Sequence, residues 1–393
     1  MAGILARIFG KPIESRAVDQ VSFGQFFGAQ PTASGQYVNP ILAENLSTVT
    51  ACVGAVASTM GSLPAYVYRA VGKGREEVTD HPVVRLLRRP NGHQTWPDWM
   101  EWTVAQVLLY GNAISAIEYD GAGRPTALIP IPWGSVQVVM LPSGRLAYDV
   151  THGTAPWGGK PISRRYLQGE VFHLKDRSDD GVIGRSRISR APDVLGNASA
   201  LQEWTGSMWK NAATPSGVLM HPKSLSDRAL ERLKVSLATR FAGPHNARRT
   251  MVLEEGLEWK SISVSPEDAE VLASRRFSVE ELCRLFQVPP PIVQDYTNNT
   301  FTNSQQAALW FAQFSLIPWA QKIQAEFGRS VFGSGSAGYS LEIDLSGLMR
   351  GDYEARWKAH QIAVQSDILD RNEIREIEGY NPRPERDPAE ESA

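Results

Sequence analysis

The spacing of hydrophobic and polar positions along the chain predicts a mixture of helices and short strands. Hydrophobic residues recur at helical spacing in a segment that Asn45 or Ser47 would cap, and again in a segment running from a Thr95 capping box to Gly111. Between residues 113 and 174 the spacing is that of short strands separated by Gly and Pro, at 113–119, 127–131, 136–141, 146–150 and 170–174. Strands at 65–69 and 339–343 and helices at 352–365 and from 369, capped by Asn372, complete an α+β pattern.

Two long helical patterns, residues 188–211 and 265–287, flank a compact segment of about fifty residues. That segment contains a predicted strand at 218–220, a helix at 226–241 and strands at 251–253 and 257–264. Because the chain leaves through one helix and returns through the other, we expect the two helices to lie side by side as a stalk.

The stretch that follows the second stalk helix has an unusual charge pattern. Three prolines, Pro289 to Pro291, end that helix, a loop rich in Asn and Thr covers 292–303, and a long helix over 304–332 contains Pro318, which should kink it. Between Arg284 and Lys322 there is no lysine or arginine, and Asp295 is the one charged residue. A loop that held phosphate firmly would carry basic residues. The loop is therefore either a solvent-exposed connector or a surface that touches a polyanion without gripping it.

Composition sets limits on the class of protein. The 393 residues suggest two or three domains, and the net charge of −2 excludes a globally basic nucleic-acid binder. No run approaches the ~20 apolar residues that a membrane span needs, so we expect a soluble protein with no membrane partner. Cys52 and Cys283 fall on apolar helical faces, which predicts two buried reduced thiols. Residues 1 to about 40 and the acidic tail from Gly379 lack periodicity and are expected to be flexible.

The motifs that usually carry catalysis or metal binding are weak in this chain. No histidine spacing suits zinc, the acidic residues Asp176, Asp179 and Asp180 fit a turn better than a calcium loop, and the Gly159-Lys160 segment is no phosphate-binding loop. Ser207-x-x-Lys210 matches a serine–lysine hydrolase by spacing, but it lies on a predicted stalk helix. The sequence therefore predicts neither an enzyme nor a cofactor or metal site.

Several short strings, in this order and spacing, give the chain a family resemblance. They are His81-Pro-Val-Val-Arg-Leu-Leu87, Tyr110-Gly-Asn-Ala113, Asp180-Gly-Val-Ile-Gly184, Pro215-Ser-Gly-Val-Leu219, Val252-Leu-Glu-Glu-Gly256, Phe286-Gln-Val-Pro-Pro290 and Asn372-Glu-Ile-Arg375. Together they span about residues 75 to 380. In this respect the chain resembles the portal proteins of long-tailed bacteriophages, a family that also serves gene transfer particles.

The resemblance implies a portal-type fold with named parts. These would be an N-terminal arm (1–36), an α+β wing (37–190), stem helices (191–216 and 265–290), a small α/β clip (217–264), a tunnel loop (291–303), a long kinked wing helix (304–332) and a short crown with an acidic tail (333–393). It also implies a homo-oligomeric ring, typically of twelve subunits, at one vertex of the virion capsid, assembled in the host cytoplasm.

Partners and site residues follow from the same resemblance. Double-stranded DNA would pass through the ring without sequence readout, the clip would meet the large terminase subunit and then the head–tail adaptor, and the ring would contact the major capsid protein. The loop residues expected to face DNA are Asp295, Tyr296, Asn298, Asn299, Thr300, Thr302 and Asn303. The clip residues expected to meet an acidic partner are Arg240, His245, Asn246, Arg248 and Arg249. The alternatives are a non-catalytic DNA-binding scaffold or a serine–lysine hydrolase.

Overall fold

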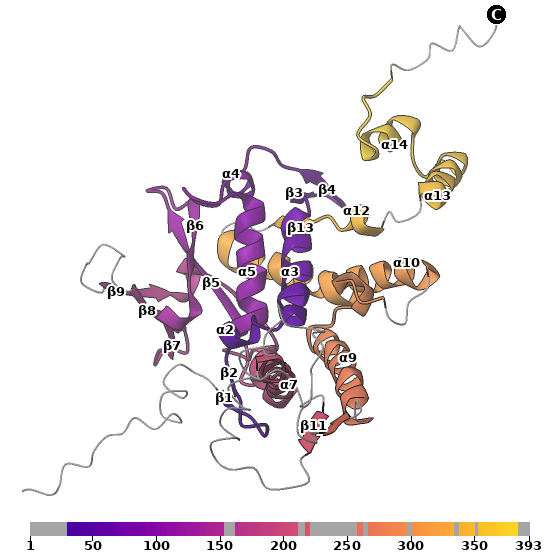
Figure 1. Ribbon diagram of the computed structural model, residues 1–393. Helices are drawn as coiled ribbons and strands as arrows, with labels where there is room; N and C mark the ends of the chain where they lie inside the picture. The colour runs from indigo at the N-terminus through magenta and orange to yellow at the C-terminus, as the bar shows by residue number, and fades with distance from the viewer. Residues whose placement is uncertain are drawn as a thin grey trace, which may run out of the picture.

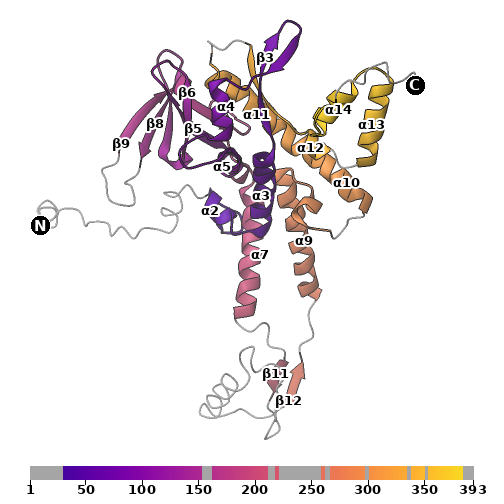
Figure 2. The same cartoon turned by 90° about the horizontal axis from the view of Figure 1, so that it is seen from above.

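The protein consists of a body of helices and sheets, from which a pair of helices projects toward a small two-stranded unit (Figures 1 and 2). The computed structural model describes residues 30–152, 162–210, 217–220, 258–261, 266–296, 301–333, 338–349 and 353–383. Within them, no helix is both long and apolar enough to cross a membrane.

Two antiparallel helices, α3 (Ser47–Ser62) and α5 (Trp96–Tyr110), form the centre of the body. Their facing sides bury Val49, Val56 and Met60 of α3 against α5. The expected cap of α3 was wrong. Its N-cap is Leu46, which makes no side-chain cap bond, so packing of the buried face fixes this helix start instead.

The capping box that was predicted for α5 is confirmed. Asp98 Oδ2 accepts from the backbone N–H of Thr95 at 2.9 Å, and the hydroxyl of Thr95 donates to the same oxygen at 2.6 Å. The helix ends at Gly111, whose φ of 80° is readily adopted by glycine.

Three antiparallel sheets of three strands each complete the body. Their strand orders are β13-β3-β4, β10-β5-β6 and β7-β8-β9. The strands are β3 (Ala65–Val71), β4 (Gly74–Glu77), β5 (Asn112–Tyr119), β6 (Pro125–Ile131), β7 (Val136–Met140), β8 (Leu146–His152), β9 (Ile162–Leu167), β10 (Val171–Lys175) and β13 (Tyr339–Ile343). The predicted strands are confirmed, whereas β4 and β9 were missed because charged residues interrupt their apolar pattern.

The strand β13 lies in the body. It pairs with β3 in a register that sets Leu341 opposite Val67, and both side chains are buried in the main core. Hydrophobic pairing thus draws 339–343 into the sheet of β3 and β4.

The last residues of the predicted N-terminal arm have secondary structure. A hairpin of β1 (Gln30–Pro31) and β2 (Tyr37–Val38) leads into α2 (Pro40–Ala43). The backbone N–H of Ala33 donates to Asp193 Oδ1 at 2.8 Å, and the Gln36 amide donates to Glu203 at 2.6 Å. Order at 30–38 thus comes from contacts 160 or more residues away, which local composition does not reveal.

The predicted stalk is confirmed. Helices α7 (Pro192–Lys210) and α9 (Pro266–Phe286) pack side by side and lead to β11 (Gly217–Met220) and β12 (Glu258–Ser261), which pair antiparallel (Figure 2). A short helix α6 (Arg187–Arg190) precedes α7, so the single helix expected from 188 is divided, because Pro192 has no N–H to continue a preceding helix. The predicted helix 226–241 and strand 251–253 lie outside the described residues.

The long helix after the loop is continuous but irregular. Helix α10 (Phe301–Trp310) passes into a π-helix η6 (Phe311–Leu316), then α11 (Ile317–Glu326) and a second π-helix η7 (Phe327–Val331). Pro318 lies in the first turn of α11, so the departure from α geometry occupies the six residues of η6 upstream of the proline.

The remaining helices are short. They are α4 (Pro82–Arg88), α12 (Ser346–Met349), α13 (Tyr353–Gln365), α14 (Arg371–Ile377) and the 3₁₀ turns η2 (Trp133–Ser135), η3 (Gln168–Glu170) and η5 (Pro290–Val293). The cap predicted for α14 was wrong. Asp370 caps it in a box with Glu373, and the amide of Asn372 instead donates to the backbone carbonyl of Arg383 at 3.0 Å.

Candidate functional site

An open groove lies where the stalk helix α9 meets the long helix. Its volume is about 810 Å³. Its lining comes from the last turns of α9, the proline turn and the α10–η6 junction, namely Arg276, Glu280, Arg284, Pro289, Asp295, Trp310 and Phe314, among others. Trp310 is 52% exposed and Phe314 59% exposed, so the molecule presents two large rings to solvent beside charged groups. Exposed hydrophobic groups of this size are typical of interaction surfaces.

The groove is shaped by the chain reversal between α9 and α10. Two non-glycine residues, Gln287 (φ 60°) and Gln294 (φ 65°), adopt left-handed conformations on either side of the prolines. The N–H of Val288 donates to Cys283 O at 2.9 Å and that of Asp295 donates to Pro290 O at 3.1 Å, which closes both turns. Left-handed conformations of such residues are typical of positions that the surrounding structure holds.

Arg187 joins this region to the body. Its guanidinium donates to Asp176 Oδ2 at 3.0 Å, to the backbone carbonyl of Phe286 at 2.7 Å and to Gln287 Oε1 at 3.2 Å. Its side chain is only 12% exposed and lies 5.7 Å from the centre of the Trp319 ring. The cation sits at the C-terminal end of α9, where the helix dipole favours positive charge. One side chain thus connects the body, the stalk and the long helix.

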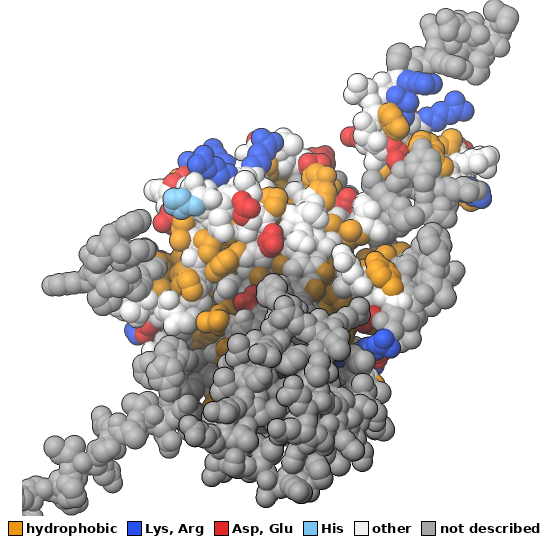
Figure 3. Space-filling view, viewed as in Figure 1, with side chains coloured by type: hydrophobic (Ala, Val, Ile, Leu, Met, Phe, Trp, Pro, Cys, Tyr) orange, Lys and Arg blue, Asp and Glu red, His pale blue; other side chains and the backbone are white. Residues whose placement is uncertain are grey.

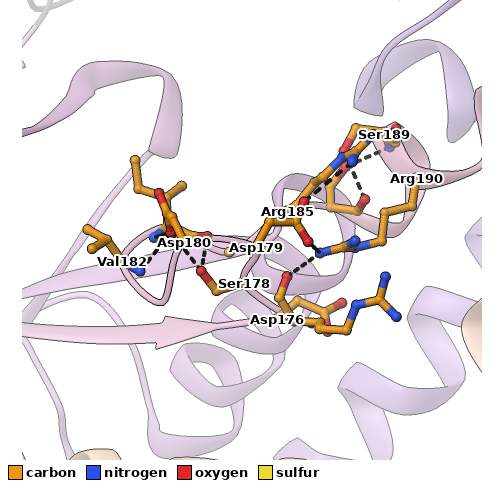
Figure 4. Close-up of polar contacts among 12 residues, drawn as sticks. Asp176, Ser178, Asp179, Asp180, Val182, Arg185, Ser189 and Arg190 are labelled. Carbon is orange, nitrogen blue, oxygen red and sulfur yellow. Dashed lines mark hydrogen bonds and ion pairs between the residues drawn. The ribbon is translucent and has the colours of Figure 1, made fainter.

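The acidic residues of 176–180 form a turn (Figure 4). Asp179 pairs with Arg190 at 2.7 Å and Arg185 at 3.4 Å, while Asp180 accepts from the backbone N–H groups of Val182 and Ile183 at 2.7 and 2.9 Å. Those N–H bonds lower the pKa of Asp180 to about 2. The predicted turn is confirmed, and within the described residues no cluster of His, Cys, Asp and Glu is arranged to hold a metal ion.

A buried polar chain supports the same turn from inside. The amide of Asn112 exchanges two hydrogen bonds with the backbone of Gly184, at 2.7 and 2.8 Å, which fixes its oxygen toward His173 Nε2 at 3.0 Å. His173 Nε2 therefore donates, and Nδ1 accepts from the hydroxyl of Tyr148 at 3.0 Å. Burial lowers the pKa of His173 to about 3 and raises that of Tyr148 to about 12, so both groups are neutral.

The predicted loop residues are only partly brought together. Asp295 and Tyr296 follow η5, and the Tyr296 ring is 60% exposed. Thr302 and Asn303 lie in the first turn of α10, so the loop is shorter than predicted, because a helix start tolerates Thr and Asn well. Asn298, Asn299 and Thr300 lie outside the described residues. So do the predicted clip residues Arg240, His245, Asn246, Arg248 and Arg249.

The serine–lysine arrangement finds no support in the position of its serine. Ser207 lies on an exposed face of α7. A nucleophile usually works in a protected substrate site, which an exposed helix face does not provide.

Sequence reasoning missed the residues that organise this region. Arg187 gave no signal, since its partners lie 11 and about 100 positions away. Trp310 and Phe314 lie in the predicted long helix, but their exposure leaves no signal in the sequence. The cluster of three prolines was the one local signal here, and it predicted only the end of the second stalk helix.

Comparison with known proteins gives consistent matches. A family model described as phage portal protein matches residues 47–379. The probable portal protein of Streptomyces phage phiC31 is 28% identical over 388 residues, which cover 95% of this chain and 83% of that protein. The portal protein of Enterobacteria phage HK97 is 29% identical over 360 residues, covering 88% of this chain and 81% of its own length.

A solved structure shares the fold. A chain from the neck of an empty gene transfer agent particle, computed with C6 symmetry, superimposes with a TM-score of 0.63 at 26% identity. The match covers 84% of this chain and 90% of that chain.

Proposed function

Because the chain belongs to the phage portal protein family, we propose that its copies assemble into a ring through which double-stranded DNA passes during packaging and ejection. The predicted family and the predicted α+β portal-type fold are confirmed by the matches. Proteins of this family are parts of phage virions or of gene transfer particles. The finer roles that follow are proposals.

The observation that carries the proposal is the projecting stalk. Helices α7 and α9 leave the body together and hold the β11–β12 pair away from it (Figure 2). In a ring of such subunits the stalks would line an axial opening, and the segment 217–264 would form one end of it. We propose that this end docks the large terminase subunit and later the head–tail adaptor, while the wing contacts the major capsid protein at one vertex.

The chain between α9 and α10 would face the DNA. This connection lies within a longer stretch, residues 285 to 321, that contains no lysine or arginine. It therefore offers few strong contacts with phosphate. The exposed ring of Tyr296 and the amides of Asn298 and Asn299 would touch the duplex transiently. A surface of this kind guides a moving polyanion without braking it.

The family is structural and non-catalytic in general, and we propose that this chain is no enzyme. It would use no cofactor, and assembly would take place in the host cytoplasm. The energy for packaging would come from the docked terminase.

The first experiment is electron microscopy of the purified protein together with its mass in solution. A closed ring of about twelve 43.3 kDa chains with a central opening is expected. A compact dimer or tetramer without an opening would reject the proposal.

A second experiment tests the loop. Replacing Asn299 by arginine would add a phosphate contact in the channel and should slow DNA packaging, while Met140→Arg, at an exposed position of β7, should not. Equal packaging rates in the two variants would contradict the proposal that the loop faces DNA in the channel.

A third experiment tests the clip. Reversing the charge of Arg248 and Arg249 together should weaken terminase binding in a pull-down or by surface plasmon resonance. Unchanged binding would show that the basic turn is merely solvated.

A further inference from the structure

Two exposed hydrophobic patches lie on different sides of the subunit. One is on α2, where Ile41 is 69% exposed and Leu42 is 42% exposed, and the other is the Trp310–Phe314 pair of the groove. In Figures 1 and 2, α2 and α10 lie on opposite sides of α3, and Figure 3 shows hydrophobic side chains over both regions. Among the residues that the structure describes, the side chains of both patches remain exposed.

The α2 patch is held in a fixed position. Asn39 Oδ1 caps the helix by accepting from the N–H of Leu42 at 2.7 Å, and Ala43 is buried in the main core. The hydroxyl of Thr50 donates to the Glu44 carbonyl at 2.7 Å, which ties the end of α2 to α3. Ile41 and Leu42 are therefore exposed on α2, a short helix that is held at both of its ends.

The groove has the size and the apolar lining to bind the side chains of Ile41 and Leu42. It is open, about 810 Å³ in volume, and its apolar surface is provided by Trp310, Phe314 and the prolines. Its charged rim is Arg276, Glu280, Arg284 and Asp295. Glu280 is paired with Arg284 at 2.7 Å, whereas no ion pair is found for Arg276 among the described residues. The α2 patch carries an acidic neighbour, the exposed Glu44.

We propose that Ile41 and Leu42 of one copy seat in the groove lined by Trp310 and Phe314 of the next copy, with Glu44 facing Arg276. The proposal rests on the ring proposed above. A ring is built from two different, complementary faces on each subunit, whereas two identical faces would close a dimer. Placement of the patches on opposite sides of α3 suits the head-to-tail arrangement.

The test uses two single variants, Ile41→Asp and Trp310→Asp. Each places a carboxylate in the proposed contact but leaves the other face of the subunit intact, and both positions are exposed, so folding should be preserved. Each variant alone should fail to form rings in mass photometry. Met140→Asp, on the exposed edge of β7, is the matched control and should form rings like the unmodified protein.

Mixing the two variants gives the decisive result. The intact α2 of the Trp310→Asp chain should enter the intact groove of the Ile41→Asp chain, which yields pairs of two chains that cannot grow further. Circular dichroism and thermal unfolding of each variant would show that the chain is folded.

The possible results distinguish a failure of the proposed interface from a failure of the proposed ring. If the unmodified protein forms rings and either variant also forms them, the interface is wrong and the ring stands. If both variants lose the ring but their mixture gives no pairs, the patches do not face each other, and the proposal is overturned. If the unmodified protein stays monomeric at every concentration, the ring itself is rejected, and the interface with it.

Discussion

Arg187 bonds to the carbonyl oxygen of Phe286 at 2.7 Å, across 99 positions of sequence. The same guanidinium holds Asp176, whose side chain is 11% exposed, so both charges of the pair are largely removed from water. The last turn of α9 is consequently attached to the body through an ionic contact in addition to hydrophobic packing.

Replacing Arg187 by alanine should destabilise the body strongly. Asp176 would lose its partner while largely buried, and the end of α9 would lose a charged donor, which together should cost about 3 kcal/mol. Thermal unfolding by calorimetry measures the change. Arg165→Ala is the control, because the Arg165–Asp149 pair is more exposed and should contribute much less to stability. Equal effects of the two substitutions would contradict the role of Arg187.

His173 should make stability depend on pH. Burial lowers the pKa of His173 to about 3 in the folded protein, whereas an unfolded histidine has a pKa near 6.5. Below about pH 6.5 the unfolded chain therefore binds a proton that the folded chain refuses. Its contribution to the free energy of unfolding is complete above that pH and falls by up to about 1.4 kcal/mol per pH unit toward pH 3.

The variant His173→Gln isolates this effect. The difference in stability between the unmodified protein and the variant, measured by urea unfolding, should shrink steadily from pH 6.5 to pH 4.5. The exposed His93 serves as the control, and His93→Gln should not change the pH dependence of the free energy of unfolding. A constant difference across this range would mean that His173 is not buried neutral.

Gly111 is constrained by space as well as by its backbone angle. A Cβ at this position would lie 2.5 Å from the backbone nitrogen of Ser186, in addition to the strain of φ 80°. Gly123 has a similar φ of 74° but open space around it. Gly123→Ala should cost about 1 kcal/mol, and Gly111→Ala distinctly more, since the chain at 184–186 must move. Similar unfolding temperatures for the two variants would argue against this close approach.

The thiols of Cys52 and Cys283 should be protected in the folded protein. Both side chains are buried and free, and contact with Cys283 together with burial raises the pKa of Cys52. Ellman's reagent should therefore detect two thiols per chain only in denaturant. A Ser207→Cys variant, on the exposed face of α7, should add one thiol that reacts at once. Immediate reaction of the native thiols would contradict the packing of α3 against α9.

Much of the fold could be predicted because local signals agree with it. The Thr95 capping box and Gly111 mark both ends of α5, and the stalk follows from two helical patterns that flank a compact segment. The predicted burial of both cysteines is confirmed for the same reason, since their neighbours repeat at helical spacing.

The site could be predicted less well because long-range contacts and helix geometry decide it. The hairpin at 30–38 is ordered by Asp193 and Glu203, and β13 by its pairing with β3, neither of which leaves a local pattern. In the long helix, the π turn of η6 has more residues per turn than an α-helix and so rotates the following side chains. Within this turn Phe311 is buried and Phe314 is exposed.

The pairing of β11 with β12 sets Gly217 opposite Ser261, so the chain enters and leaves the intervening segment at one place. The two ends of the segment are thus joined by the backbone hydrogen bonds of β11 and β12. A segment that is closed in this way can differ in sequence between related chains without changing the register at which the stalk meets it.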